Sequence, residues 1–347
     1  MHIPDGFINP SIAMAMFVLS FVFLVWSWRK VQAAYSKSST AVLAISSAFV
    51  FAAQMINYPI ALGTSGHLVG GTFLAVLLGP YAGMLSMTIV LLMQALFFAD
   101  GGLIAFGANV FNMAVIGALS FFVVRFLTRN SKGNGRFASS VFIASWLSVV
   151  LGALACALEI GFSSVFAGSG GVLVIVPSML FWHTIIGIGE GAITGFIDCA
   201  STFQSLRLRR FPAHEADGET MRKKLLALIL IIIFLSVFIP FASTSPGGLE
   251  KVAKTIGIEE NTPVWRGLMF DYSLEAVRNP YVSTLIAGIL GDLSCLIGFS
   301  GSRRSPNKEE QFFQRKQNLR KACSGVNALR HFSLSYWLFN KSCILPI

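Results

Sequence analysis

Two histidines in this chain are of the residue type and position best suited to binding a transition metal. His2 follows Met1 directly, and because methionine is usually removed only before small residues, we expect Met1 to remain. The chain then offers three successive nitrogens: the Met1 amine, the His2 backbone amide and Nδ1 of the His2 imidazole. A metal bound to them closes a five-membered and then a six-membered ring. Ni(II) and Cu(II) displace the amide proton and suit nitrogen ligands in a square plane.

A fourth nitrogen is needed to complete such a square. His67 follows the glycine-containing loop 63–66, and it is the only other histidine that the topology given below places on the same side of a membrane as His2. Neutral imidazole is the commonest side-chain ligand for metals. Either histidine alone can equally be accidental, so it is their shared location that favours a metal site formed by Met1, His2 and His67.

Other polar residues could support this site without binding the ion. Asp5 and Asp100 stand in glycine turns, where they would orient ligands, collect cations or be ordinary turn residues. His183 and Glu190 share one helix face, and an ionisable residue within a span indicates function by default, although a buried structural hydrogen bond fits each equally well. The candidates for a supporting role are Asp5, Thr64, Ser65, Asp100, His183 and Glu190.

The elements that must position these residues are membrane spans. Of the 347 residues, 54% are hydrophobic and 12% are charged, whereas a soluble domain has about 25% charged residues. This excludes a soluble enzyme and a disordered protein. Despite the net charge of +10, a nucleic-acid-binding domain is excluded as well, because Lys and Arg cluster between apolar runs as cytoplasmic loops do. Continuous apolar runs also exclude an outer-membrane barrel, whose strands alternate.

Nine apolar runs predict nine helical spans. Proline ends a helix at the preceding residue, so Gly79-Pro80 divides the long run 67–99 into two spans. With nine spans all basic clusters fall on one side, which the positive-inside rule makes cytoplasmic. We therefore expect a multi-pass protein of the cell (inner) membrane, with the N-terminus outside and the C-terminus in the cytoplasm. The runs are 11–28, 40–62, 67–79, 81–99, 104–127, 138–160, 172–205, 225–241 and 281–299.

The expected fold class is an all-α polytopic membrane protein. A seven-helix bundle occupies residues 1–205, and a C-terminal two-helix hairpin occupies residues 225–299, with a segment outside between its two spans. A charged cytoplasmic linker, 206–224, joins the two, and a basic tail, 300–347, follows without an assignable function. Proline and glycine in the first ten residues predict a bent, non-helical start over the outer mouth.

Short patterns bear on partners and catalysis. Ala44, Ala48 and Ala52 are spaced four apart in the second predicted helix, where they either pack inside the bundle or dock a partner membrane subunit. No Walker A pattern is present, so the chain does not hydrolyse ATP itself. The five cysteines show no CxxC spacing, which argues against a disulfide framework or zinc knuckle. We expect no catalytic residue and no permanent cofactor.

Three motifs, in order, resemble one known family. They are Met1-His2-Ile3-Pro4-Asp5-Gly6, the loop 63–71 (GTSGHLVGG) and residues 94–112 (QALFFADGGLIAFGANVFN). Together they are similar, over about residues 1–205, to the substrate-binding membrane subunit of cobalt and nickel energy-coupling-factor importers, the CbiM/NikM type. Segment 243–253 resembles the small accessory subunit with a Pro-Asp-Gly-Leu-Glu motif (CbiN/NikN-like), although Gly247 stands where that motif has Asp.

The resemblance implies a fold and a function. It implies an S-component fold with an additional N-terminal helix, and metal binding by the Met1 amine, the His2 amide and imidazole, and the His67 imidazole. It also implies Ni(II) or Co(II) as the substrate, without separating the two, and as partners a transmembrane coupling subunit and two cytoplasmic ATPases, docked through small residues such as Ala44, Ala48 and Ala52. The alternatives are a proton-coupled secondary transporter of a small solute, with His183 and Glu190 as a relay, and an intramembrane enzyme, for which no paired constellation is apparent.

Overall fold

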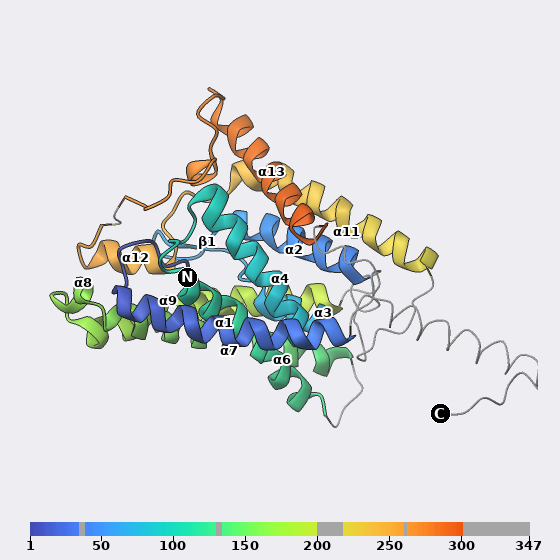
Figure 1. Ribbon diagram of the computed structural model, residues 1–347, viewed down its shortest axis with the longest axis horizontal. Helices are drawn as coiled ribbons and strands as arrows, with labels where there is room; N and C mark the ends of the chain where they lie inside the picture. Colours follow the sequence, from blue (N-terminus) through green and yellow to red (C-terminus); the bar gives the residue numbers. More distant parts are fainter. Residues whose placement is uncertain (35–38, 130–133, 200–217, 260–261, 301–347) are drawn as a thin grey trace, which may run out of the picture. The chain divides into compact units, whose positions relative to one another are not determined.

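The computed structural model describes residues 1–34, 39–129, 134–199, 218–259 and 262–300, which are mostly helical (Figure 1). The helices are α1 (Pro10–Ala34), α2 (Ser39–Met55), α3 (Gly71–Leu78), α4 (Pro80–Met93), α5 (Phe106–Asn109), α6 (Ile116–Leu127), α7 (Asn134–Gly161), α8 (Ser164–Ala167), α9 (Gly171–Cys199), α11 (Gly218–Phe238), α12 (Gly248–Thr255) and α13 (Pro280–Ser300). Two π-helical segments, η1 (Gln94–Phe98) and η2 (Val110–Val115), extend α4 and join α5 to α6. Two short 3₁₀ turns are η3 (Ile239–Phe241) and η4 (Phe270–Tyr272).

The fold class expected from the sequence is confirmed. In the described ranges, six helices are long and apolar enough to cross a membrane, and two shorter apolar helices cover 40–55 and 229–241. Each of the nine predicted runs contains a helix. The chain is therefore an all-α, multi-pass membrane protein. Residues 1–9 are not helical, as their prolines and glycine predicted.

The predicted break at Gly79-Pro80 is also confirmed. Helix α3 ends at Leu78 and α4 begins at Pro80, with Gly79 between them at φ 83°. The prediction that 67–79 is one helical span was wrong, because α3 begins only at Gly71. Eight helical residues rise about 12 Å, far less than the roughly 30 Å of a bilayer core. The residues before α3 are therefore an extended segment that packs within the protein.

The second predicted span, 40–62, ends earlier than expected. Helix α2 stops at Met55, and a two-stranded antiparallel hairpin follows, with β1 (Tyr58–Pro59) paired to β2 (Ser65–Gly66). The reason lies in Pro59, which disfavours a helical conformation for the residue before it. His67 consequently follows a strand directly rather than beginning a helix.

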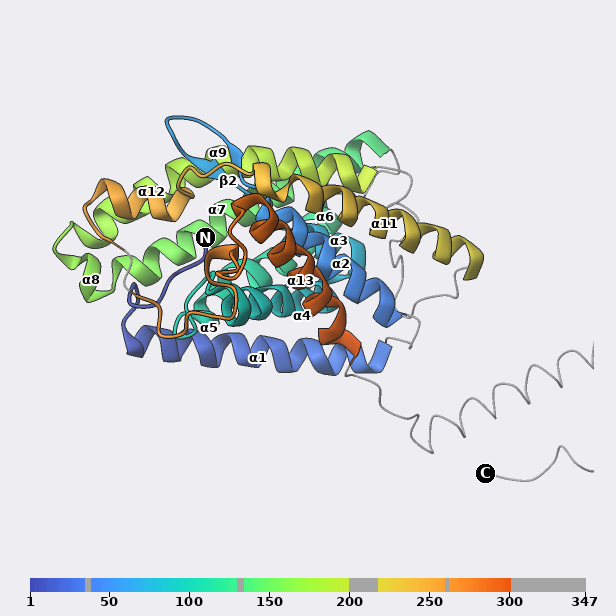
Figure 2. The ribbon, with the colours of Figure 1, turned by 90° about the horizontal axis from the view of Figure 1, so that it is seen from above.

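The C-terminal hairpin packs onto the seven-helix unit. Helices α11 and α13 contact α2, α13 also contacts α4, and α12 contacts α9 (Figures 1 and 2). Helix α11 begins at Gly218, so the end of the predicted linker 206–224 is helical. Residues 200–217 and the predicted tail from 301 onward lie outside the described residues.

The small-residue face of α2 is covered by this chain itself. Ala44 is 8% exposed, and Ala48 and Ala52 are completely buried. Close approach between helices is what small residues permit, and here α2 contacts α11, α13, α4 and α3. The burial of these alanines favours the first of the two alternatives given above, packing inside the bundle.

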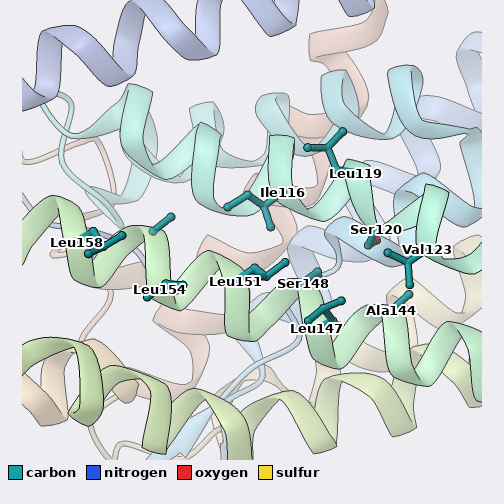
Figure 3. Close-up of a pocket in the computed structure, with 11 residues that line it drawn as sticks. Ile116, Leu119, Ser120, Val123, Ala144, Leu147, Ser148, Leu151, Leu154 and Leu158 are labelled. Carbon is teal, nitrogen blue, oxygen red and sulfur yellow. The ribbon is translucent and has the colours of Figure 1, made fainter.

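A groove of about 320 Å³ runs between α6 and α7 (Figure 3). Its lining is aliphatic apart from Ser120 and Ser148, and none of the eleven lining residues is ionisable. Such a lining offers no ligand for a metal ion. The candidate site therefore has to be built elsewhere.

Candidate metal site

The first residues of the chain form a buried arm. Met1 is 9% exposed, Ile3 is fully buried, and the Met1 side chain lies over Gly152 of α7. Asn109, at the end of α5, holds the arm through both ends of its amide. Its Oδ1 accepts from the Ile3 amide at 2.8 Å, and its Nδ2 donates to the Ile3 carbonyl at 3.1 Å. The backbone is thus fixed one residue after His2.

Asp5 fastens the same arm further along. Its Oδ1 accepts from the Ile104 amide at 2.9 Å, and its Oδ2 accepts from the Val264 amide at 3.1 Å. The carboxylate therefore joins three segments that are distant in sequence: the arm, the loop before α5 and the segment between α12 and α13. Asp5 positions the arm, as expected for a supporting residue.

His2 and His67 come together although 65 positions separate them. Their ring centroids are 5.6 Å apart and their planes are inclined by 51°. His67 Nδ1 lies 2.9 Å from the Leu68 carbonyl oxygen, and since a carbonyl can only accept, Nδ1 carries the proton and Nε2 has a bare lone pair. The Met1 amine lies within electrostatic reach of the His67 ring and of Asp100.

Asp100 orients the His2 ring. The π-helical segment η1 ends at Phe98, and the left-handed conformation of the next residue, Ala99 (φ 58°), turns the chain toward the arm. Asp100 then accepts a hydrogen bond from His2 Nδ1 and a second one, at 2.5 Å, from the Tyr272 hydroxyl. His2 Nε2 is buried without a hydrogen-bond partner among the described residues. A carboxylate on one ring nitrogen with the other left bare is common for metal-ligating histidines, but here the bare nitrogen is Nε2, whereas the chelate with the N-terminal amine needs Nδ1.

Glu190 and Gln54 hold the extended segment after His67. Glu190 accepts from the Val69 amide at 2.6 Å and from the Gly70 amide at 3.0 Å. On the other side, the Gln54 side-chain amide donates to the Val69 carbonyl at 2.7 Å. Irregular backbone within a membrane protein needs such internal partners, because lipid supplies none. Glu190 therefore positions His67 through the backbone.

The remaining supporting candidates have other contacts. Ser65 donates through its amide to the Pro246 carbonyl (2.9 Å) and through its hydroxyl to the Ser245 carbonyl (2.6 Å), so it ties the hairpin to the segment before α12. Thr64 is 1% exposed, and its amide donates to the Ala61 carbonyl within the loop. His183 is 2% exposed and bonds to a carbonyl of its own helix. His214 and His331 lie outside the described residues.

The electrostatics of the site favour a neutral Met1 amine and a neutral His67 ring. Burial lowers the pKa of the Met1 ammonium below its ordinary value, although the charge of Asp100 opposes this. Burial, the Met1 amine and the His2 ring lower the pKa of His67 to about 4. Burial alone would raise the pKa of Asp100, but the charge of His2 and the hydrogen bond from it hold that pKa well below its ordinary value. Neutral nitrogens are the forms that bind a metal.

Side chains alone do not make this a metal centre. In the described part of the chain, no three His, Cys, Asp or Glu side chains are grouped so as to hold an ion. What the arm adds is the amine of Met1 and the backbone amide of His2, two nitrogens that no side-chain pattern reveals. The arrangement can therefore act as a metal site only with main-chain nitrogens.

Sequence reasoning missed three supporting residues. Asn109 carried a signal, since it is a polar side chain within an apolar run. Gln54 carried the same kind of signal. Tyr272 carried none, because its partner Asp100 lies 172 positions away.

The glycine that replaces Asp in the accessory-type motif stands at the start of α12. Gly247 is the N-cap residue, and its amide donates to Glu250 Oε2 at 3.2 Å. A Cβ at this position would meet no atom within 4 Å. Because Asp is among the best N-cap residues and Gly is only a few tenths of a kcal/mol worse, we expect Gly247→Asp to stabilise the first turn of α12 slightly.

Hydrogen exchange checks this expectation. The amides of Leu249 and Glu250 should exchange more slowly in Gly247→Asp than in the parent protein. Gly168→Asp is a suitable control, since a Cβ there also meets open space. Faster exchange in Gly247→Asp would contradict the capping role.

Comparison with known proteins gives a consistent result. Residues 2–201 match the family model CbiM, described as the cobalt uptake substrate-specific transmembrane region. A putative fused nickel transport protein NikMN from Archaeoglobus fulgidus is 39% identical over 87% of this chain and 98% of its own length. A probable fused nickel transport protein LarMN from Lactiplantibacillus plantarum is 31% identical over 83% of this chain and 90% of its own.

A solved structure is also similar. The crystal structure of a truncated transition metal transporter superposes with a TM-score of 0.51 at 34% identity, covering 57% of this chain and 96% of that one. The two fused relatives extend the similarity past residue 201, into the segment that contains α11 to α13.

Proposed function

The chain belongs to the CbiM family of cobalt uptake substrate-specific transmembrane regions, and from that premise we propose that it captures Ni(II) or Co(II) outside the cell for an ATP-driven importer of the energy-coupling-factor type. The observation that carries the proposal is the meeting of the Met1 amine, His2 and His67 at one buried place. Four nitrogens are then available there: the amine, the His2 amide, and one nitrogen from each ring.

Loading of this site requires a rotation of the His2 ring and the transfer of one proton. The chelate uses His2 Nδ1, which donates to Asp100 in the structure. To bind the ion, Nδ1 must release this proton to solvent and turn away from Asp100, while Nε2 takes up a proton from solvent and donates it to a carboxylate or carbonyl, as metal-bound imidazoles do. The ring of His67 needs no such change, because its Nε2 is already bare.

The donor set bears on the choice of metal. Planar nitrogen coordination with a deprotonated amide suits Ni(II) better than Co(II). The similar proteins from Archaeoglobus fulgidus and Lactiplantibacillus plantarum are named as nickel transport proteins. We therefore propose nickel as the preferred substrate, with cobalt as an accepted one.

The affinity for the ion should rise steeply with pH. The His2 amide must always lose its proton, so the association constant should rise about tenfold per pH unit above the pKa of the Met1 ammonium. Below that pKa the ammonium must also lose a proton when the ion binds, so the association constant should rise by about two decades per pH unit. His67 contributes only below its pKa of about 4. Calorimetric titration across a pH series measures the slope, and an affinity independent of pH above neutrality would contradict it.

The importer needs partners that this chain does not supply. It has no Walker A pattern, so we propose a transmembrane coupling subunit and two cytoplasmic ATPases as the source of energy. We also propose that the N-terminal arm faces the outside and that the C-terminus is cytoplasmic, since this places the basic clusters inside.

Uptake of radioactive nickel by cells that produce the full set of subunits tests the function. We expect uptake to stop when ATP is depleted and to continue when only the proton gradient is collapsed. The opposite pattern would favour the alternative, a proton-coupled secondary transporter. Removal of the ATPase subunits is the matched control, and undiminished uptake without them would overturn the proposal.

A further inference from the structure

His183 in α9 has the same chemical form as His67. Its Nδ1 lies 2.8 Å from the Met179 carbonyl oxygen. Because a carbonyl can only accept a hydrogen bond, Nδ1 carries the proton and Nε2 is unprotonated, with a lone pair that can bind a metal. No described residue forms a hydrogen bond to this Nε2. A backbone carbonyl that fixes the tautomer and leaves the second nitrogen free is the usual support of a metal-ligating histidine.

The ring of His183 lies beside the candidate metal site. Gly248, in the first turn of α12, covers it closely: a Cβ there would lie 2.7 Å from His183 Cε1 and 3.0 Å from Nε2. Ile186, one turn further along α9, contacts both Gly248 and Gly66, the residue before His67. His183 is also within electrostatic reach of His67 and of the Met1 amine. The ring therefore lies against the start of α12, and Ile186 connects this place with the segment that carries His67.

His183 is not a member of the same coordination sphere. In the ranges that the structure describes, His2, His67 and His183 are not grouped so that their side chains hold one ion together. The four nitrogens proposed for bound nickel also fill a square plane without it. A bare imidazole nitrogen next to a complete site, but outside it, suits an earlier stage of binding.

We propose that His183 Nε2 is a transfer ligand, which binds the incoming Ni(II) or Co(II) ion beneath Gly248 and passes it to His67. The proposal rests on the proposed function of the four-nitrogen site. In the first step the hydrated ion exchanges one water molecule for His183 Nε2. In the second step it exchanges that nitrogen for Nε2 of His67. Both rings stay neutral, and neither step changes an oxidation state.

The decisive variant is His183→Asn. The Asn side-chain nitrogen occupies the place of Nδ1 and keeps a donor for the Met179 carbonyl, while the position of Nε2 is lost. Stopped-flow mixing of the purified full-length protein with nickel should show loading slowed by roughly tenfold or more, the usual size of an effect on a supporting residue. The equilibrium dissociation constant should change by less than about threefold. Ser178→Ala, on the same helix, is the control and should load like the parent.

Gly248→Ala is an independent second variant. Its methyl group would push the His183 ring away from α12 without changing the chemistry of the imidazole. It should also slow loading, and it keeps the proposal testable if His183→Asn does not fold. Unchanged loading in the folded variants would overturn the transfer role alone. A loss of equilibrium affinity as large as that of His67→Ala would overturn it as well, since His183 would then belong to the final site. Failure of the parent protein to bind nickel would overturn the four-nitrogen site together with the transfer role.

Discussion

Nickel binding should be lost from both His2→Ala and His67→Ala proteins. Each substitution removes one of the four nitrogens, and in the described part of the chain no three His, Cys, Asp or Glu side chains are grouped so as to hold an ion in their place. A four-ligand structural metal site is worth about 10–16 kcal/mol, so each ligand carries roughly 3 kcal/mol. That share corresponds to a weakening of about 100-fold or more. Calorimetric titration of the purified proteins measures it.

The loss should not come from unfolding. The segment after His67 is held by Glu190 and Gln54 through backbone groups, and the arm is held by Asn109 through Ile3. Neither anchor uses the ring that His67→Ala removes. We expect thermal unfolding of the metal-free His67→Ala protein to match that of the parent. Tight nickel binding retained in either variant would refute the four-nitrogen site.

Acetylation of the Met1 amine should abolish nickel binding while leaving every side chain in place. The acetyl group converts the amine into an amide and leaves no free amine at the chain end, so the five-membered ring can no longer close with His2. Space is lacking as well, since Met1 is 9% exposed and packs over Gly152. We expect an effect at least as large as that of His67→Ala.

The protein with an unmodified Met1 amine is the matched control. Both proteins can be compared by calorimetry at one pH and one salt concentration. If the acetylated protein keeps its affinity, the amine is not a ligand and the proposed chelate is wrong.

The residues with distinctive chemistry were recognisable from the sequence. His2 next to a retained Met1 defines a chelate by covalent geometry alone, and Gly79-Pro80 marks a helix break by the stereochemistry of proline. Glu190 stood out as an ionisable residue within an apolar helix. These predictions depend on local rules, and local rules can be read without the fold.

What the sequence did not reveal depends on contacts between distant segments. The bond between Tyr272 and Asp100 joins residues 172 positions apart, and no periodicity encodes it. The hairpin that follows α2 depends on pairing between Tyr58 and Gly66, although the effect of Pro59 on the end of α2 is local and could have been recognised from the sequence. The interaction of His2 Nδ1 with Asp100 was equally invisible, because it describes the metal-free state rather than the chelate.

The most direct test of the chelating amino end is the magnetic state of nickel bound to the full-length protein. Ni(II) held by four nitrogens in a plane, one of them a deprotonated amide, is diamagnetic, whereas Ni(II) in octahedral or tetrahedral coordination is paramagnetic. We expect the loaded protein to be diamagnetic. A paramagnetic ion at full occupancy would show that the Met1 amine and His2 amide do not form the proposed plane.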